Sequence, residues 1–185
     1  NINIGDYMML PNVERKVLVN SIRNINELNV NIFRLNVHGN TQLDPSVKED
    51  YAKLQKLLFP GVLQTITRRY IGQPAWKENT DSLVLEGLPV GVYLMEATTD
   101  NGSIEPQRAL LRVSDLYVMQ ETLPEKHVRY VVVNATTGKP VPGAHIRLTT
   151  ESRYDNEKAQ TVTLVTDKNG EADHAYAKNS PDLVY

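Results

Sequence analysis

Short runs in which apolar and polar residues alternate dominate this chain of 185 residues. Such runs of about four to eight residues, ended by glycine, proline or asparagine, are typical of antiparallel strands with one buried face. In the clearest run, Leu28 to Leu35, the side chains of Leu28, Val30 and Ile32 share one face and the asparagines between them share the other. The pattern predicts an all-β fold of antiparallel sandwiches.

A second run, Lys16 to Ile22, precedes this strand, with Val17 and Val19 on one face. Asn24 and Asn26 lie between the two runs. Asparagine accepts left-handed backbone and hydrogen-bonds its own chain, so it favours turns. We therefore expect the two runs to form a β-hairpin.

One segment has the spacing of a helix. Its apolar residues recur at steps of four and three, at Val47, Tyr51, Leu54 and Leu58, which places them on one helical face. Asp44 is the expected N-cap and Pro45 the first helical residue, and Phe-Pro-Gly at 59–61 ends the segment. The sequence predicts one α-helix over 45–58, covering an open end of a sandwich rather than binding a partner.

The alternation continues to the end of the chain. The further predicted strands are Val62 to Ile71, Ser82 to Leu85, Val92 to Thr98, Gln107 to Val113, Leu116 to Met119, Val128 to Val133, Ala144 to Leu148, Gln160 to Val165 and Glu171 to Tyr176. Asn101-Gly102 is a strong hairpin signal, and a polar loop is expected at 151–158. In Gln107 to Val113, one face carries Arg108, Leu110 and Arg112, so we expect that strand to be half-buried.

The alternation restarts on new turns after Val113, so we predict two tandem immunoglobulin-like sandwich domains. The first covers residues 1–113 and contains the helix, and the second covers 114–185. About five strands are predicted in the second domain, whereas an immunoglobulin-type sandwich has about seven. We therefore expect the second domain to be incomplete at its C-terminal end, and the chain to be a fragment of a longer protein.

Composition excludes several classes of function. There are 20 basic and 22 acidic residues and no cysteine, so we expect neither a nucleic-acid partner nor disulfides nor thiolate chemistry. The cluster Arg68, Arg69 and Tyr70 is interpreted as a solvated strand edge. No apolar run of about 18 residues is present, so no membrane insertion of this chain is expected.

Candidate metal sites are weak. His38, His127, His145 and His174 stand singly, without the spacing of a zinc motif. The alternative that His145 and His174 meet across neighbouring strands stays open as a minor one. Asp167-x-Asn169-Gly170 resembles the start of a calcium loop, but the glutamate expected at its twelfth position is missing. A tight turn explains these residues better.

Catalytic motifs are not found either. Nucleophile elbows, phosphate loops and dinucleotide-binding glycines are absent from the sequence. Asn101-Gly102-Ser103 and Asn134-Ala135-Thr136 match glycosylation acceptors, but both stand where turns are expected. The sequence predicts no catalytic residue, no cofactor site and no metal site, and therefore no enzyme. A site assembled across strands remains the minor alternative.

Three short segments are more specific. In chain order they are Leu88-Pro89-Val90-Gly91-Val92-Tyr93, Ser114-Asp115-Leu116 and Thr137-Gly138-Lys139-Pro140-Val141-Pro142-Gly143-Ala144. They resemble bacterial alpha-2-macroglobulins, in which an L-P-x-G-x-Y turn and strand end one macroglobulin domain and T-G-K-P-V-x-G-A opens the next. The strand at Asn29 to Leu35 is similar to the preceding strands of that family. The glycines, prolines and tyrosine of these motifs are expected to be structural.

The resemblance implies scaffold domains of a bacterial alpha-2-macroglobulin-like protease trap. Its partners would be neighbouring macroglobulin domains of the same chain and, through the full-length protein, a target protease. The family's thioester requires a cysteine, and this chain has none, so bait and any thioester would lie elsewhere. The resemblance also implies a periplasmic or surface location in the cell envelope, with a lipid anchor outside this chain.

A second function class remains open. The segment T-G-K-P-V-P-G-A followed by T-D-K-N-G is shared by transthyretin-like and carboxypeptidase-regulatory-like sandwiches. The alternative is therefore a surface adhesion or outer-membrane accessory module. The second half of the chain alone does not separate the two hypotheses.

Overall fold

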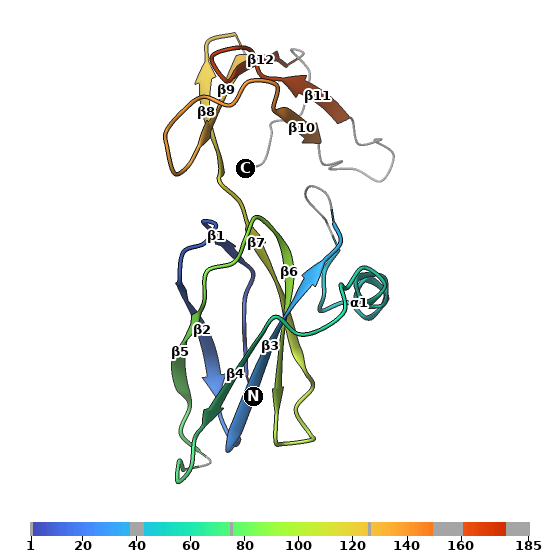
Figure 1. The fold of residues 1–185 in the computed structure, drawn as a ribbon, viewed down its shortest axis with the longest axis vertical. Helices are drawn as coiled ribbons and strands as arrows, with labels where there is room; N and C mark the ends of the chain where they lie inside the picture. The colour runs from blue at the N-terminus through green and yellow to red at the C-terminus, as the bar shows by residue number, and fades with distance from the viewer. Residues whose placement is uncertain (1, 38–42, 75, 126, 150–160, 177–185) are drawn as a thin grey trace. The chain divides into compact units, whose positions relative to one another are not determined.

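The computed structural model describes residues 2–37, 43–74, 76–125, 127–149 and 161–176. The predicted loop at 151–158 and His38 lie outside this part of the chain. The structure divides into two compact units, residues 1–114 and 115–185, and each is described by itself. Within the described residues the fold is all-β with a single short helix, as predicted (Figure 1).

The described residues of unit 1 form seven strands in two sheets. A five-stranded sheet has the order β1-β7-β6-β3-β4, and β2 pairs with β5 in a second sheet. All neighbours are antiparallel except β1 and β7, which are parallel. The bounds are β1 (Tyr7–Met9), β2 (Arg15–Ile22), β3 (Glu27–Leu35), β4 (Gln64–Arg69), β5 (Asn79–Leu85), β6 (Gly91–Thr99) and β7 (Gln107–Val113).

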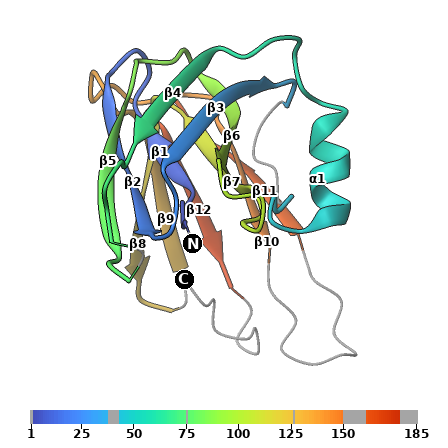
Figure 2. The same cartoon turned by 90° about the horizontal axis from the view of Figure 1, so that it is seen from below.

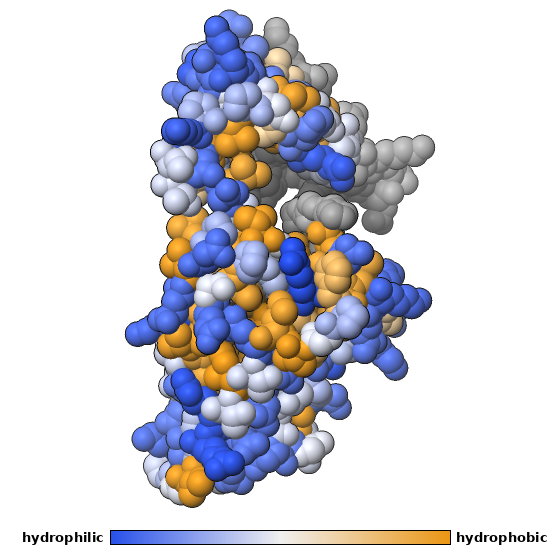
Figure 3. All heavy atoms as spheres, in the orientation of Figure 1, coloured by the Kyte–Doolittle hydropathy of each residue, from blue (hydrophilic) through white to orange (hydrophobic). Residues whose placement is uncertain are grey.

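The core of unit 1 lies between these two sheets, which form the two layers seen in Figure 2. Leu28, Val30 and Ile32 of β3 are fully buried, and so are Val17 and Val19 of β2. The alternation that predicted these strands is therefore the alternation between core and outer face. Figure 3 shows apolar residues interspersed with polar ones over the visible face of this unit, as is usual for protein surfaces.

The predicted hairpin between the second and third strands is wrong. Strand β2 pairs with β5 and β3 pairs with β4 and β6, so the chain crosses from one sheet to the other between them. Asn24 does adopt left-handed backbone at φ 58°, so the turn itself was predicted correctly. The crossing follows from burial, because the apolar faces of β2 and β3 pack against each other across the core rather than lying side by side.

The predicted helix exists but is shorter than expected. Helix α1 spans Lys48–Gln55, and Val47 occupies the N-cap position in extended conformation without a side-chain hydrogen bond. The expected N-cap, Asp44, instead accepts hydrogen bonds from the amide and hydroxyl of Ser46, at 2.8 and 2.6 Å. These bonds close a turn ahead of the helix and hold the pKa of Asp44 below its usual range.

Helix α1 lies against the outer face of the five-stranded sheet (Figure 1). There it builds a second apolar cluster, separate from the core between the sheets, whose buried members are Leu35, Leu54, Val92, Leu94 and Leu110. The strand Gln107 to Val113 was expected to be buried on one face only. Because α1 covers Leu110, the outer face of this strand is buried at that residue too. The periodicity of a single strand could not show that a helix would cover it.

Unit 2 contains the five predicted strands within its described residues. A three-stranded sheet has the order β12-β9-β8, and β10 pairs with β11 in a second sheet. The bounds are β8 (Leu116–Leu123), β9 (His127–Asn134), β10 (His145–Thr149), β11 (Thr161–Val165) and β12 (Glu171–Ala175). Its buried apolar side chains are Val128, Tyr130, Val132 and Ala172.

Candidate functional site

The first family-like motif is a turn closed by its tyrosine. Tyr93 is fully buried, and its hydroxyl donates a 2.7 Å hydrogen bond to the carbonyl of Pro89. A Cβ added at Gly91 would lie 3.4 Å from the Tyr93 ring, an ordinary contact distance, so the ring packs directly beside this residue. Burial raises the pKa of the Tyr93 phenol, which keeps it protonated as a donor. The motif acts as a structural corner, similar in kind to the tyrosine corner of immunoglobulin-like domains.

The third family-like segment, Thr137 to Ala144, forms the turn after β9. The side-chain oxygen of Asn134 accepts hydrogen bonds from the amides of Thr136 and Thr137, at 3.0 and 2.9 Å. Gly138 and Gly143 have φ of 68° and 71°, a conformation that favours glycine. The Asn134 carboxamide thus organises a turn, and its nitrogen is bonded as well, which favours the turn interpretation over glycan acceptance.

Ser114 and Asp115 of the second family-like segment belong to different units, and each is held within its own unit. The Ser114 amide donates to the carbonyl of Met9 at 3.0 Å in unit 1. In unit 2, Asp115 accepts from the side-chain nitrogen of Asn134 at 2.9 Å and from the amide of Ala135 at 2.6 Å. These backbone and side-chain bonds fix the start of β8 beside the end of β9.

The calcium-like sequence at Asp167 is a turn. One oxygen of Asp167 accepts hydrogen bonds from the amides of Asn169 and Glu171, at 2.8 and 2.9 Å. Gly170 has φ of 75° and donates its amide to the Asp167 carbonyl at 3.0 Å. This carboxylate therefore faces backbone donors, as expected for an Asx-type turn, and the turn leads from one sheet of unit 2 to the other.

The structure places His145 and His174 in different sheets of unit 2. His145 stands in β10, opposite Val165 of β11, whereas His174 stands in β12 of the other sheet. The His174 ring contacts Tyr176 edge to face, with centroids 4.4 Å apart. Within the described ranges, no group of three or more histidine, aspartate or glutamate side chains is arranged to hold a metal ion.

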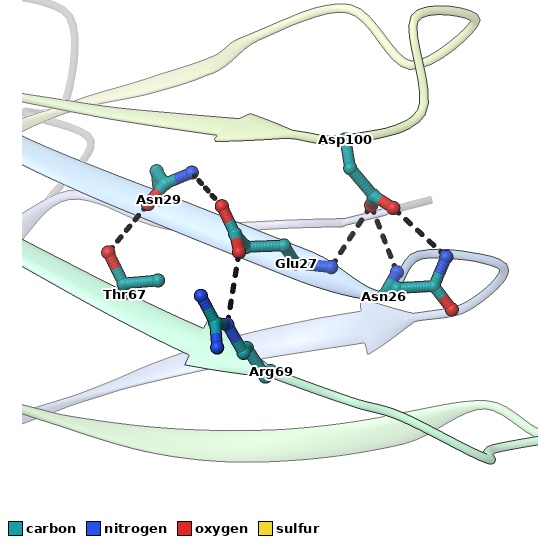
Figure 4. A network of polar contacts seen from close by, with 6 residues as sticks. All are labelled: Asn26, Glu27, Asn29, Thr67, Arg69 and Asp100. Atoms are coloured by element: carbon teal, nitrogen blue, oxygen red, sulfur yellow. Dashed lines mark hydrogen bonds and ion pairs between the residues drawn. The ribbon is translucent and has the colours of Figure 1, made fainter.

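A polar network lies at one end of unit 1, around Asp100 (Figure 4). The Asp100 carboxylate accepts hydrogen bonds from the backbone amides of Asn26 and Glu27, at 2.9 and 3.0 Å. It also accepts one from the side-chain nitrogen of Asn26, at 3.0 Å. The amide of Glu27, followed by the two groups of Asn26, lowers the pKa of Asp100. The neighbouring Asn101 donates to the carbonyl of Asn24 at 3.0 Å. The β6–β7 turn thereby ties down the crossing from β2 to β3.

Sequence reasoning singled out Asn101-Gly102 at this turn but missed Asp100. The available signal was an aspartate directly before Asn-Gly, where short polar side chains bond nearby backbone. Its partners at Asn26 and Glu27 are distant in sequence, so no local pattern could identify them.

Glu27 extends the same network along the outer face of the sheet (Figure 4). It accepts hydrogen bonds from Asn29 at 3.0 Å and from Arg69 at 3.2 Å, and these bonds, first that of Asn29, lower its pKa. The Thr67 hydroxyl donates to Asn29 at 2.6 Å. Glu27 and Asp100 both have lowered pKa values, whereas a general acid working near neutral pH needs a raised one. The network is built to hold strands.

Arg68 and Arg69 end the edge strand β4, as expected, but Tyr70 follows the strand and is buried, at 8% exposed, so the expected solvated edge is wrong for the tyrosine. Arg69 is paired with Glu27, and Arg68 lies 3.7 Å from Asp81. The Tyr70 hydroxyl donates to Asp81 at 2.8 Å, and burial together with that bond raises its pKa. The cluster is thus neutralised by carboxylates, which does not favour polyanion binding.

A third polar group connects α1 to the sheet. The Tyr51 hydroxyl donates to Glu96 at 3.0 Å, and Arg108 donates to the same carboxylate oxygen at 2.7 Å. The Arg108 guanidinium carbon lies 3.8 Å from the centroid of the Tyr51 ring, in cation–π geometry. Burial lowers the pKa of Arg108, but the bond to Glu96 and the approach of Tyr51 outweigh it and raise the pKa overall.

A shallow hollow of about 70 Å³ lies at the same end of unit 1 as Asp100. Its lining includes Arg23, Asn24, Asn26 and Gln73, without a titratable pair that could exchange protons. Among the described residues, no helix combines the length and apolarity needed to cross a membrane.

Sequence comparison finds no match among protein-family models or curated proteins. Structural comparison finds similarity to a crystal structure of native alpha-2-macroglobulin from Escherichia coli spanning domains MG0-NIE-MG1. The alignment covers 97% of this chain and 59% of that one, at 19% identity and a TM-score of 0.57. This chain therefore spans less than two thirds of the structure it matches.

Two further alignments each cover 97% of this chain, but their TM-scores lie below 0.5 and do not establish a shared fold. One is to the native conformation of E. coli alpha-2-macroglobulin determined by electron cryo-microscopy, at a TM-score of 0.39 and 17% identity, and it covers 12% of that chain. The other is to a chaperone–tip adhesin complex of CFA/I fimbriae, at a TM-score of 0.34 and 12% identity, and it covers 89% of that chain. At the level of fold, then, the chain is similar to macroglobulin domains of E. coli alpha-2-macroglobulin.

Proposed function

We propose that the two units are scaffold domains of a macroglobulin-like protease trap. The observation that carries this proposal is the fold similarity to the E. coli alpha-2-macroglobulin crystal structure over 97% of the chain. The motifs that resemble the family support it, because Tyr93 closes a corner and Gly138 and Gly143 form a turn. These are positions where a domain architecture, rather than a reaction, selects the residue.

The proposal includes no catalytic role for this chain. The carboxylates Glu27, Asp100 and Asp167 accept hydrogen bonds that hold turns and strands. In such a protein, capture chemistry would belong to segments other than these units, and the units would form part of the wall that moves when bait is cut. We extend the proposal to a location in the cell envelope, with anchoring by another segment.

The test uses the full-length protein and a broad-specificity protease. We expect cleavage at one region, followed by compaction that native electrophoresis and small-angle scattering detect. The matched control is the same protease inactivated at its catalytic residue, which should leave both the chain and its dimensions unchanged. The isolated chain of 185 residues should not reduce protease activity.

Indiscriminate cleavage without a change in dimensions would contradict the proposal. Inhibition by the isolated chain would contradict the assignment of capture to other segments. Neither result would alter the fold similarity, which rests on the structure alone.

A further inference from the structure

We infer that α1 is a separately opening cover on the sheet of unit 1, held shut by a polar latch of Tyr51, Glu96 and Arg108. In the open state, residues 44–56 leave the sheet while the sandwich beneath stays folded. This inference does not depend on the proposed scaffold role.

The first support is the separation of the two apolar clusters. Of the five buried residues under the helix, Leu54 alone comes from α1, and the other four belong to β3, β6 and β7. Those strands pack against β2 and β5 through their opposite faces. Lifting α1 therefore removes the fully buried Leu54 and the partly buried Tyr51 from the cluster and leaves the core between the sheets in place.

The second support is that α1 is too short to persist alone. It has eight residues and no side-chain N-cap bond, whereas isolated helices shorter than about 12–15 residues are marginal in water. Helix formation and docking are therefore coupled. When the helix leaves the sheet it also melts, which releases conformational entropy and favours opening.

The third support is the form of the attachment. The latch joins α1 to β6 and β7 through one shared oxygen of Glu96, and the Glu96 and Arg108 side chains are about one fifth exposed, at 19% and 22%. After the helix, the chain is anchored differently: the amide of Asn36 donates to the carbonyl of Leu57 at 2.7 Å, and that of Phe59 to the carbonyl of Arg34 at 2.9 Å. These bonds tether the far end of the cover, so opening is hinged rather than complete.

The consequence of opening is a new apolar surface. Val92, Leu94 and Leu110, all at most 8% exposed in the closed state, would become exposed on the outer face of the sheet, whereas Leu35 keeps its bridge to Leu58. The latch therefore sets how often this face meets solvent.

Amide hydrogen exchange followed by NMR on the 185-residue chain tests the inference. The amides of Tyr51 and Lys56, which donate to the carbonyls of Val47 and Lys53, should exchange at least about 100-fold faster than amides of β6, with little dependence on urea. Tyr51→Phe removes the latch hydroxyl. It should speed exchange of the helix amides about fivefold and leave β6 unchanged.

Tyr70→Phe is the matched control, because it removes another tyrosine hydroxyl bonded to a carboxylate of unit 1, that of Asp81. It should leave exchange of the α1 amides unchanged. Three results would overturn the inference: equal exchange rates and urea dependence for α1 and β6, no effect of Tyr51→Phe on α1, or the same effect on α1 from Tyr70→Phe.

Discussion

Both units are all-β, but they differ in how many apolar side chains they bury and in how much they depend on their turns. Unit 1 buries Val17, Val19, Leu28, Val30 and Ile32 completely between two sheets. The described part of unit 2 has a thinner set of buried apolar residues, and Val132 is its most buried at 2% exposure.

Turn chemistry makes up the difference in unit 2. Asn134 and Asp167 each organise a turn through backbone donors, and Gly138, Gly143 and Gly170 adopt left-handed backbone there. A sheet whose side chains bury little depends more strongly on the residues that set its connections. The comparison predicts that, among glycines with left-handed backbone, a substitution should cost most at Gly170 of unit 2, and that a core substitution should cost most in unit 1.

The largest expected effect is at a glycine of unit 2. A Cβ at Gly170 would lie 2.5 Å from the Val132 carbonyl oxygen and 3.0 Å from the Val141 amide nitrogen, and its φ is 75°. Gly170→Ala should therefore lower the free energy of unfolding of unit 2 by about 3 kcal/mol, from backbone strain and displacement of β9 together. Urea unfolding followed by NMR signals of β9 and β12 measures it.

Gly138→Ala is the control for that substitution. Gly138 also has left-handed backbone, with φ of 68°, but its added Cβ would meet open space. The strain alone should cost about 1 kcal/mol. Equal losses at the two glycines would show that crowding at Val132 does not matter and would weaken the comparison.

The next effect compares one residue type in the two cores. Val30→Ala removes a fully buried side chain between two sheets, and Val132→Ala removes one in the thinner core of unit 2. We expect losses of about 2 and about 1 kcal/mol, because a cavity with more neighbours loses more contacts. NMR signals of each unit during urea unfolding give the two values. A larger loss at Val132 would reverse the ranking of the cores.

The smallest effect concerns acid and unit 1. Because the pKa of Asp100 is lower in the folded state, its carboxylate contributes stability above the unfolded pKa of about 3.9. That contribution is lost as the pH falls through the lower folded pKa. Asp100→Asn should flatten the fall in the urea midpoint of unit 1 between about pH 4 and pH 2. An unchanged slope would mean that the network around Asn26 does not depend on this charge.

Local pattern was sufficient for most strands. The run from Leu28 to Leu35 became β3, and Gln107 to Val113 became β7 with the predicted bounds. Glycine and asparagine positions predicted the turns at Asn24 and Gly170 because left-handed backbone is a local property. Composition alone likewise excluded disulfides, because the chain has no cysteine.

Pairing could not be predicted in this way. The alternation in β2 is compatible with β3 as its neighbour in one sheet or with β3 as its partner across the core. In the structure, β3 lies in the other sheet, across the core. The helix start was misplaced because Asp44 satisfies Ser46 instead of a helix amide. The latch at Glu96 joins residues far apart in sequence, Tyr51 and Arg108.

The sequence by itself determined the strands, the turns and the location of a helix, because backbone conformation and alternating burial act over a few neighbouring residues. Only the tertiary structure decided which strands share a sheet, that α1 covers Leu110, and that Asp100 secures the crossing at Asn26. Those choices depend on contacts between distant residues, whose free energy no local pattern contains.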